Sequence, residues 1–321
     1  MKGENIIKNL SLGGLFSHDK NSVDLRAMQI EDGVRIHTCI NYGESLEVIK
    51  LASIGKEKKL KLLTKIYFKY PDFNHVRFRP LIEQLDEIVY RLGFVPTDWI
   101  IQICCYCNLN QFKSYKAQEF FFKINKKYKI ERVFLEYYPV YKYNFSDLSN
   151  LNIYYGTKKI SFGLIGYQNL LNRVFSDDDI KFLYEKSISL MFIGFLGKGI
   201  QNKIIPKYII QDKEKIDIVS ANIAYFISLS KKYGNIEGIT QVSSFEHYED
   251  LKQRFLEKKA CSNYLEINKS YQIYYFKNYD QYGGYIPYQK YFKNPKLLIS
   301  RIKYLLMSNI FSLKFGRNFW G

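Results

Sequence analysis

Three cysteines, Cys104, Cys105 and Cys107, stand close together and have an evident capacity for chemistry. Thiolates are ligands for soft metals such as zinc. On a strand, however, Cys105 would point away from its neighbours, and no fourth ligand can be identified. The chain has five cysteines, at spacings that fit neither a disulfide framework nor a known zinc motif. We therefore expect reduced thiols packed among apolar side chains, and no metal site.

Ser243 and Ser244 precede a stretch with helical periodicity that begins at Phe245. The backbone N–H groups in the first turn of a helix can bind a phosphate group. A serine in this place also serves as an ordinary helix N-cap. The sequence leaves both interpretations of Ser244 open.

Other catalytic motifs are not found in the sequence. There is no phosphate loop of Walker type, no nucleophile-elbow serine and no His-Glu-x-x-His. These short motifs therefore do not identify a reaction.

The elements that position these residues can be predicted from hydrophobic periodicity. Short apolar runs have the composition of buried strands: 34–36, 61–66, 99–105, 132–135, 161–166, 188–195 and 238–242. Amphipathic stretches predict helices: 81–92, 177–186, 216–232 and 245–257. This alternation predicts parallel strands joined by helical crossovers, and it fits a barrel better than an open doubly wound sheet. We predict an α/β fold, a (β/α)8 TIM barrel over residues 1–260, followed by an extension over 261–321.

Several segments, taken in order, carry a family resemblance. Residues 33–43 read GVRIHTCINYG, residues 62–66 read LLTKI, and residues 91–104 run from RLG to WIIQIC. Residues 162–201 contain GYQNLLNR and a glycine-containing loop, and residues 239–247 read ITQVSSFEH. In their order and spacing these segments resemble the aldo-keto reductases, over roughly residues 10–258. The resemblance implies an (α/β) barrel that binds NADP or NAD.

The resemblance also implies a mechanism, in which a nicotinamide hydride goes to a carbonyl carbon and a tyrosine protonates its oxygen. Tyr42 occupies the place of that tyrosine, and Lys65 occupies the place of the lysine that assists it. A phenol with a reference pKa of about 10 must be tuned toward neutrality, and a nearby ammonium group does this by stabilising the phenolate. By the alternative interpretation, both residues are ordinary members of a basic chain with 29 tyrosines.

Two other parts of the family's catalytic tetrad are missing. The position of its aspartate falls on His37 or Thr38, neither of which is a carboxylate. The position of its histidine falls on Cys104, or on Cys105 or Tyr106 if the strand is shifted. A thiol is a weak hydrogen-bond donor, so carbonyl reduction should be impaired or altered. His37 could restore an acid or base function, since its reference pKa is near neutral, or it could be structural.

The cofactor site implied by the resemblance is partly retained. Ile165 stands where the family has a glutamine that contacts the nicotinamide amide, whereas Asn169 is kept, either for binding or for structure. Gly194 lies in the glycine-containing loop, and Ser243 and Ser244 precede the helix that would receive the cofactor phosphate.

The chain carries a formal charge of +17, which favours an anionic partner such as a phosphate cofactor, nucleic acid or a membrane surface. A general abundance of Lys, Ile, Asn, Tyr and Phe explains the charge equally well. Residues 1–16 lack an apolar run of signal-peptide length, and no stretch approaches the roughly 20 apolar residues of a membrane span. We therefore expect a cytoplasmic protein.

The segment 285–321 is basic and aromatic and contains no acidic residue. It could cover a substrate pocket, or bind an anionic membrane surface on the inner face of the membrane. Nucleic-acid binding is disfavoured, because no recognised nucleic-acid motif accompanies the aromatic residues. We favour packing against the barrel with some peripheral membrane contact.

Two functions follow from these observations. The first is a divergent NAD(P)-dependent oxidoreductase that acts on a carbonyl or hydroxyl group of a small polar, sugar-like substrate. The second is a non-catalytic descendant of the fold that binds a nucleotide or a partner protein, in surface-glycan assembly. Fold alone does not decide between them.

Overall fold

The computed structural model describes much of the chain up to residue 256. It covers residues 9–13, 35–55, 60–67, 78–104, 115–137, 145–151, 154–155, 158–170, 173–196, 218–234, 236–241 and 245–256. The predicted C-terminal extension, 261–321, lies outside these residues.

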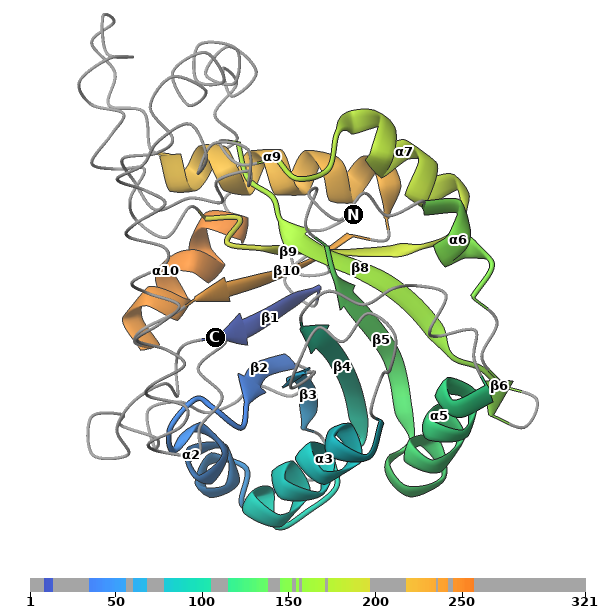
Figure 1. The fold of residues 1–321 in the computed structure, drawn as a ribbon. Helices are drawn as coiled ribbons and strands as arrows, with labels where there is room; N and C mark the ends of the chain where they lie inside the picture. The colour runs from blue at the N-terminus through green and yellow to red at the C-terminus, as the bar shows by residue number, and fades with distance from the viewer. Residues whose placement is uncertain are drawn as a thin grey trace, which may run out of the picture.

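Strands and helices alternate along the described residues (Figure 1). The strands are β1 Leu10–Gly13, β2 Arg35–Cys39, β3 Lys61–Tyr67, β4 Asp98–Cys104, β5 Ile130–Glu136, β6 Tyr154–Tyr155, β7 Lys158–Lys159, β8 Ser161–Tyr167, β9 Ser189–Ile193 and β10 Ile236–Gln241. The helices are α2 Ser45–Ala52, α3 Phe78–Leu92, α5 Tyr115–Tyr128, α6 Phe145–Ser149, α7 Asp177–Glu185, α9 Ile218–Tyr233 and α10 Phe245–Leu256.

Eight of the described strands form one closed barrel, in the order β1-β10-β9-β8-β5-β4-β3-β2. All neighbouring strands in it are parallel, and β1 closes the ring by pairing with both β10 and β2. The short strands β6 and β7 form a separate antiparallel pair. The prediction of a (β/α)8 barrel is therefore confirmed.

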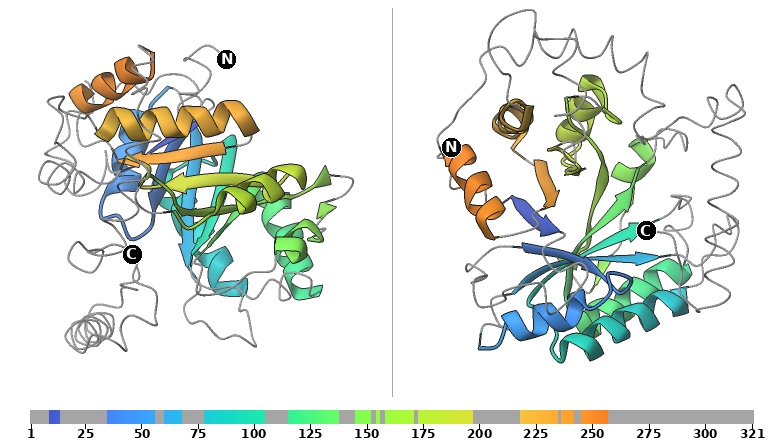
Figure 2. Two further views of the ribbon diagram at one scale, coloured as in Figure 1. Left: turned by 90° about the horizontal axis from the view of Figure 1, so that it is seen from above. Right: turned by 90° about the vertical axis from the view of Figure 1, so that its left-hand side faces the viewer.

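The helices surround the barrel on its outer side. In Figures 1 and 2, α2, α3 and α5 lie together beside β2 to β5, whereas α7 and α9 lie beside β8, β9 and β10. The large apolar core lies between strands and helices and includes Leu62, Ile101 and Leu85, each fully buried. At the start of α7, Ser176 and Asp179 form a capping box. Three aspartates in the first turn lie at the positive end of the helix dipole, where negative charges stabilise the helix.

A second apolar cluster fills the inside of the barrel. It consists of Leu63, Ile100, Phe134, Ile165, Met191 and Ile239, with Ile193 packed against them. Side chains on a strand alternate between two faces. The residues two positions before and after these therefore also face the barrel axis, and they form polar layers below and above the apolar one.

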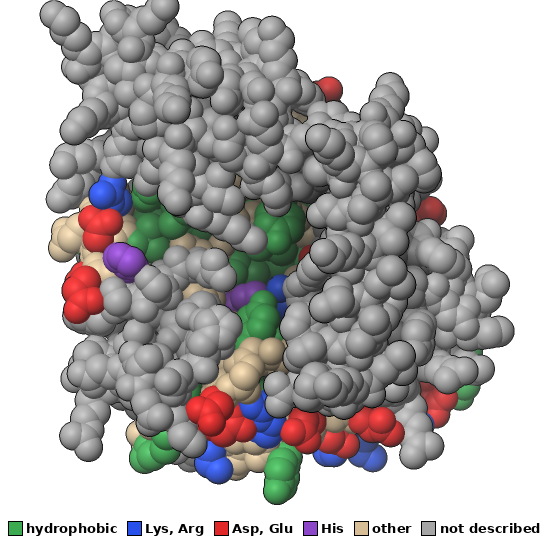
Figure 3. Space-filling model, turned by 60° about the vertical axis from the view of Figure 1, so that its left-hand side comes forward, with side chains coloured by type: hydrophobic (Ala, Val, Ile, Leu, Met, Phe, Trp, Pro, Cys, Tyr) green, Lys and Arg blue, Asp and Glu red, His purple; other side chains and the backbone are tan. Residues whose placement is uncertain are grey.

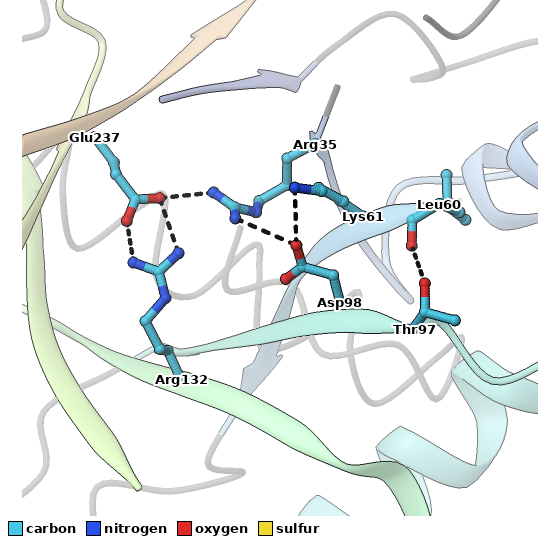
Figure 4. A network of polar contacts seen from close by, with 7 residues as sticks. All are labelled: Arg35, Leu60, Lys61, Thr97, Asp98, Arg132 and Glu237. Atoms are coloured by element: carbon cyan, nitrogen blue, oxygen red, sulfur yellow. Dashed lines mark hydrogen bonds and ion pairs between the residues drawn. The ribbon is translucent and has the colours of Figure 1, made fainter. Parts of the chain in front are cut away.

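The polar layer at the amino-terminal ends of the strands is an ion network (Figure 4). Glu237 on β10 is shared by Arg35 on β2, at 2.6 Å between Nη1 and Oε2, and by Arg132 on β5. Lys61 and Arg35 both approach Asp98 Oδ2, at 3.3 and 3.9 Å. The network joins five strands across the barrel at the end where TIM-barrel residues serve stability.

Candidate functional site

The opposite polar layer lies toward the carboxyl ends of the strands, where the active sites of TIM barrels are found. It includes His37 on β2, Lys65 on β3 and Gln102 on β4. Lys65 and Gln102 are direct neighbours in the register of β3 and β4, and each lies two residues beyond a member of the inner apolar cluster. These polar side chains therefore lie next to the inner apolar cluster, on its carboxyl-terminal side.

Tyr42 and Lys65 meet at this end of the barrel. Tyr42 lies in the turn between β2 and α2, and the Nζ atom of Lys65 is 5.6 Å from the centroid of its ring. The turn is closed by backbone hydrogen bonds from Tyr42 N to Cys39 O and from Ser45 N to Tyr42 O. Gly43 follows with a φ of +56°, a left-handed conformation that glycine adopts without strain. The two residues singled out in the sequence are therefore brought together.

His37 lies beside this pair and is only 6% exposed. Its ring centroid is 6.0 Å from that of Tyr42, in an edge-to-face arrangement. Burial and the positive charge of Lys65 hold the pKa of His37 well below its usual value, although the Gln102 side chain acts in the opposite direction. The imidazole is therefore neutral near pH 7. Its Nε2 atom is buried and has no hydrogen-bond partner among the described residues.

The structure shows which of the two side chains, His37 or Thr38, faces the barrel interior. His37 faces the barrel interior, toward Tyr42 and Lys65. Thr38 faces the other way, and its hydroxyl contacts that of Ser45 on α2 at 2.6 Å. The alternation of side chains along β2 explains this difference. Of the two candidates in the sequence, only His37 belongs to the group at the barrel mouth.

Two residues of this layer were not identified from the sequence. Gln102 is fully buried and lies close enough to His37 to affect the pKa of the imidazole, but neither of its side-chain amide atoms makes a hydrogen bond to another described residue. Glu136 is also buried, at the end of β5 and two residues beyond the inward-facing Phe134. The inward periodicity of β4 and β5 indicates both residues, and Gln102 also lies within the segment 91–104 that carries the family resemblance. Unsatisfied buried amides are rare in proteins, and they indicate a place where a water molecule or a ligand can bind.

Asn169 and Gly194 lie together beyond β8 and β9. The side-chain amide of Asn169 donates a hydrogen bond to the carbonyl oxygen of Gly194, at 2.9 Å. Gly194 has a φ of +63°, and an added Cβ would lie 3.3 Å from the ring of Tyr167. Asn169 therefore has a structural contact, which joins the loops after two neighbouring strands.

Of the other positions implied by the resemblance, the structure describes Ile165 in full and the remaining ones in part or not at all. Ile165 is fully buried in the inner apolar cluster, and its side chain has no hydrogen-bonding group. Cys104 ends β4, but its side chain lies outside the described residues, as do Cys105, Ser243 and Ser244.

The face toward which β1 and β10 point is shown in Figure 3. Figure 3 shows hydrophobic side chains, one histidine and a Lys or Arg gathered in the middle of this face, with Asp and Glu side chains near its edges. Among the described residues, no helix has both the length and the apolar character needed to cross a membrane.

Comparisons with known proteins agree with the barrel. No protein-family model and no curated protein sequence matches the chain. Among solved structures, an aldo-keto reductase from Klebsiella pneumoniae in complex with NADPH superimposes with a TM-score of 0.61 at 14% identity, covering 82% of this chain and 91% of that one. An aldo/keto reductase from the same organism, with NADP and acetate, gives 0.57 at 14% identity, with the same coverage. The chain therefore has the fold of the aldo-keto reductases.

Proposed function

We propose that the chain is an NAD(P)-dependent oxidoreductase that reduces a carbonyl group, or oxidises the corresponding hydroxyl, on a small polar substrate. The observation that carries this proposal is the meeting of Tyr42 and Lys65 at the carboxyl ends of the barrel strands, with 5.6 Å between the ammonium nitrogen and the ring centroid.

The residues at the barrel mouth are compatible with a polar ligand. Within the described part of the chain, His37 Nε2 and both amide atoms of Gln102 are buried without hydrogen-bond partners, so a ligand or water that reaches them gains hydrogen bonds without breaking others. Asn169 and Gly194 would lie at the side of the nicotinamide, and Ser243 and Ser244 near the cofactor phosphate. With Ile165 in place of a glutamine, the nicotinamide would be held by packing more than by a hydrogen bond.

In the proposed reaction, the cofactor would supply the hydride and the protein would supply the proton. A reduced nicotinamide bound at this end of the barrel would supply a hydride to the carbonyl carbon. Tyr42 donates the proton of its Oη atom to the carbonyl oxygen, which becomes a hydroxyl. Lys65 favours the loss of this proton, because an ammonium group stabilises a phenolate. His37 is neutral, so it does not compensate the positive charge of Lys65, whereas an aspartate in its place would.

One observation favours a second candidate, a binding protein without catalytic activity. The place of a carboxylate beside Lys65 is taken by a buried neutral imidazole. The orientation of a catalytic lysine depends on the side chains around it. Replacement of a neighbouring carboxylate by an imidazole can therefore abolish turnover while the binding site persists. This candidate predicts NADPH affinity without turnover.

Tyr42→Phe tests the proposed function. The full chain is assayed for NADPH oxidation with glyceraldehyde as a sugar-like probe. Removal of the phenol proton should lower turnover by roughly 10²- to 10⁴-fold with little change in NADPH affinity. Tyr90→Phe is a matched control, because Tyr90 on α3 is 81% exposed. Undiminished turnover in Tyr42→Phe would exclude Tyr42 as the proton donor, and NADPH binding without turnover in the parent would favour the second candidate.

A further inference from the structure

Arg91, in the last turn of α3, binds the loop that carries Tyr42. Its Nη1 donates to the carbonyl oxygen of Ile40 at 2.9 Å, and its Nη2 donates to that of Gly43 at 2.6 Å. These two residues lie on either side of the Asn41-Tyr42 dipeptide. One guanidinium group therefore fixes the loop at both ends of the segment that presents the phenol.

The same guanidinium is held by Glu47 on α2. Its Nε and Nη2 atoms donate to the two carboxylate oxygens of Glu47, at 2.6 and 2.7 Å. This hydrogen bonding raises the pKa of Arg91, against the effect of its partial burial. A planar guanidinium offers its five donors in a fixed geometry, so the bidentate pair with Glu47 fixes the orientation of the nitrogens that reach the loop.

The arrangement fixes the Tyr42 loop to two helices at once. Glu47 lies on the helix that follows the loop, and Arg91 lies 44 residues further along the chain. The backbone hydrogen bonds of the turn join Tyr42 to Cys39 and Ser45, and Arg91 adds bonds to Ile40 and Gly43, which lie outside β2 and α2. Positioning of this kind matters because a displacement of about 1 Å at a reacting group can lower a rate by about 10²-fold.

We propose that Arg91 is a positioning residue for Tyr42, acting through its hydrogen bonds to the Ile40 and Gly43 carbonyl oxygens and oriented by Glu47. Its effect on catalysis rests on the proposed function, because it requires Tyr42 to be the acid. The fixing of the loop does not, and it can be measured without cofactor or substrate.

The test places 3-fluorotyrosine at position 42 of the full chain and records its ¹⁹F spectrum. The parent should give one narrow resonance. Arg91→Lys keeps the charge but cannot reach Glu47 and both carbonyl oxygens together, so the resonance should broaden or split. Glu47→Gln should give a smaller change in the same direction, because Arg91 keeps its two bonds to the loop.

Two controls separate positioning from general loss of structure. Asp86→Asn breaks another salt bridge of α3, to Lys127 on α5 at 2.8 Å, and should leave the resonance of position 42 unchanged. Fluorotyrosine at Tyr184, on α7, should not respond to Arg91→Lys. A folded Arg91→Lys variant with an unaltered resonance at position 42 would overturn the proposal, as would an equal response at Tyr184.

If turnover is found, Arg91→Lys should lower kcat by roughly tenfold or more and change KM by less than about twofold, because orientation and not binding is lost. A changed KM with unchanged kcat would contradict the positioning role. If no turnover is found and the resonance still responds, the proposed function fails and the fixing of the loop by Arg91 stands.

Discussion

The side chains at the barrel mouth combine an ammonium group, a phenol and a buried imidazole. His37 lies against Tyr42 at 6.0 Å between ring centroids, and Gly13 approaches it so closely that an added Cβ would lie 3.1 Å from its Nδ1 atom. A protonated His37 would place a second positive charge next to Lys65 in a buried site. The imidazole therefore remains neutral, and its contribution to the site is a hydrogen-bonding group without charge.

This neutrality predicts a specific loss of stability in acid. The folded-state pKa of His37 lies well below 6.5, whereas the unfolded chain binds a proton at about that pH. The contribution of His37 to the free energy of unfolding should therefore fall as the pH drops through 6.5, by up to about 1.4 kcal/mol at pH 5.5. Urea unfolding at pH 7.5 and 5.5 should show that His37→Gln lacks this part of the loss.

His247→Gln, which changes an exposed histidine on α10, is the control and should keep the acid sensitivity of the parent. If His37→Gln and the parent lose the same stability between these pH values, His37 is not held neutral by its surroundings.

At the scale of the elements, two layers of side chains inside the barrel connect the strands to one another. The inner apolar cluster takes one residue from each of six strands, and the ion network below it joins β2, β3, β4, β5 and β10. Glu237 is the centre of the network, since Arg35 and Arg132 both bind its carboxylate. Its side chain is only 10% exposed. Removing the shared carboxylate leaves two guanidinium groups close together with their charges uncompensated.

Glu237→Gln should therefore destabilise the barrel by about 3–5 kcal/mol, as expected when one partner of a buried ion pair is removed. Asp86→Asn, at an exposed salt bridge, should change stability by less than about 1 kcal/mol. The midpoints of urea unfolding at pH 7.5 measure both. Similar midpoints for the two variants would show that the network contributes no more than a surface ion pair.

The elements also show why part of the fold could be predicted and part could not. The strands β3, β4, β5 and β8 were placed within two residues of their ends, because buried parallel strands are continuous apolar runs. β1, with only Leu10–Gly13, is too short to give such a run, and α2 and α5 were not identified. Their apolar residues are interspersed with basic and acidic ones over eight and 14 residues.

Part of the candidate site could likewise be predicted from the sequence, and part could not. Tyr42, Lys65 and His37 follow from a local resemblance, because each lies in a short motif on one strand or its following turn. Arg91 and Gln102 also lie in a segment that carries the resemblance, residues 91–104, but the sequence indicates no role for either side chain. The partners of Arg91 include two backbone carbonyl oxygens, which any residue offers, and Gln102 becomes notable because its buried amide has no hydrogen-bond partner among the described residues.

At the scale of the whole molecule, the inside of the barrel divides into three layers. Its amino-terminal end contains the ion network, its middle is apolar, and its carboxyl-terminal end contains the Tyr42–Lys65 pair together with His37 and Gln102. The chain also carries a formal charge of +17, which attracts anions without any specific site. A test for a dinucleotide cofactor must therefore distinguish a built site from general anion binding.

The most direct test is a titration of the thermal unfolding midpoint with NADPH and NADH, with tripolyphosphate at the same concentrations as a control for anion binding. A ligand that binds only the folded barrel at 100 times its Kd adds about 2.7 kcal/mol to the free energy of unfolding. We predict a saturable rise in Tm with at least one of the two dinucleotides, well above the effect of tripolyphosphate. A rise no larger than that of tripolyphosphate would contradict a cofactor site at the barrel mouth.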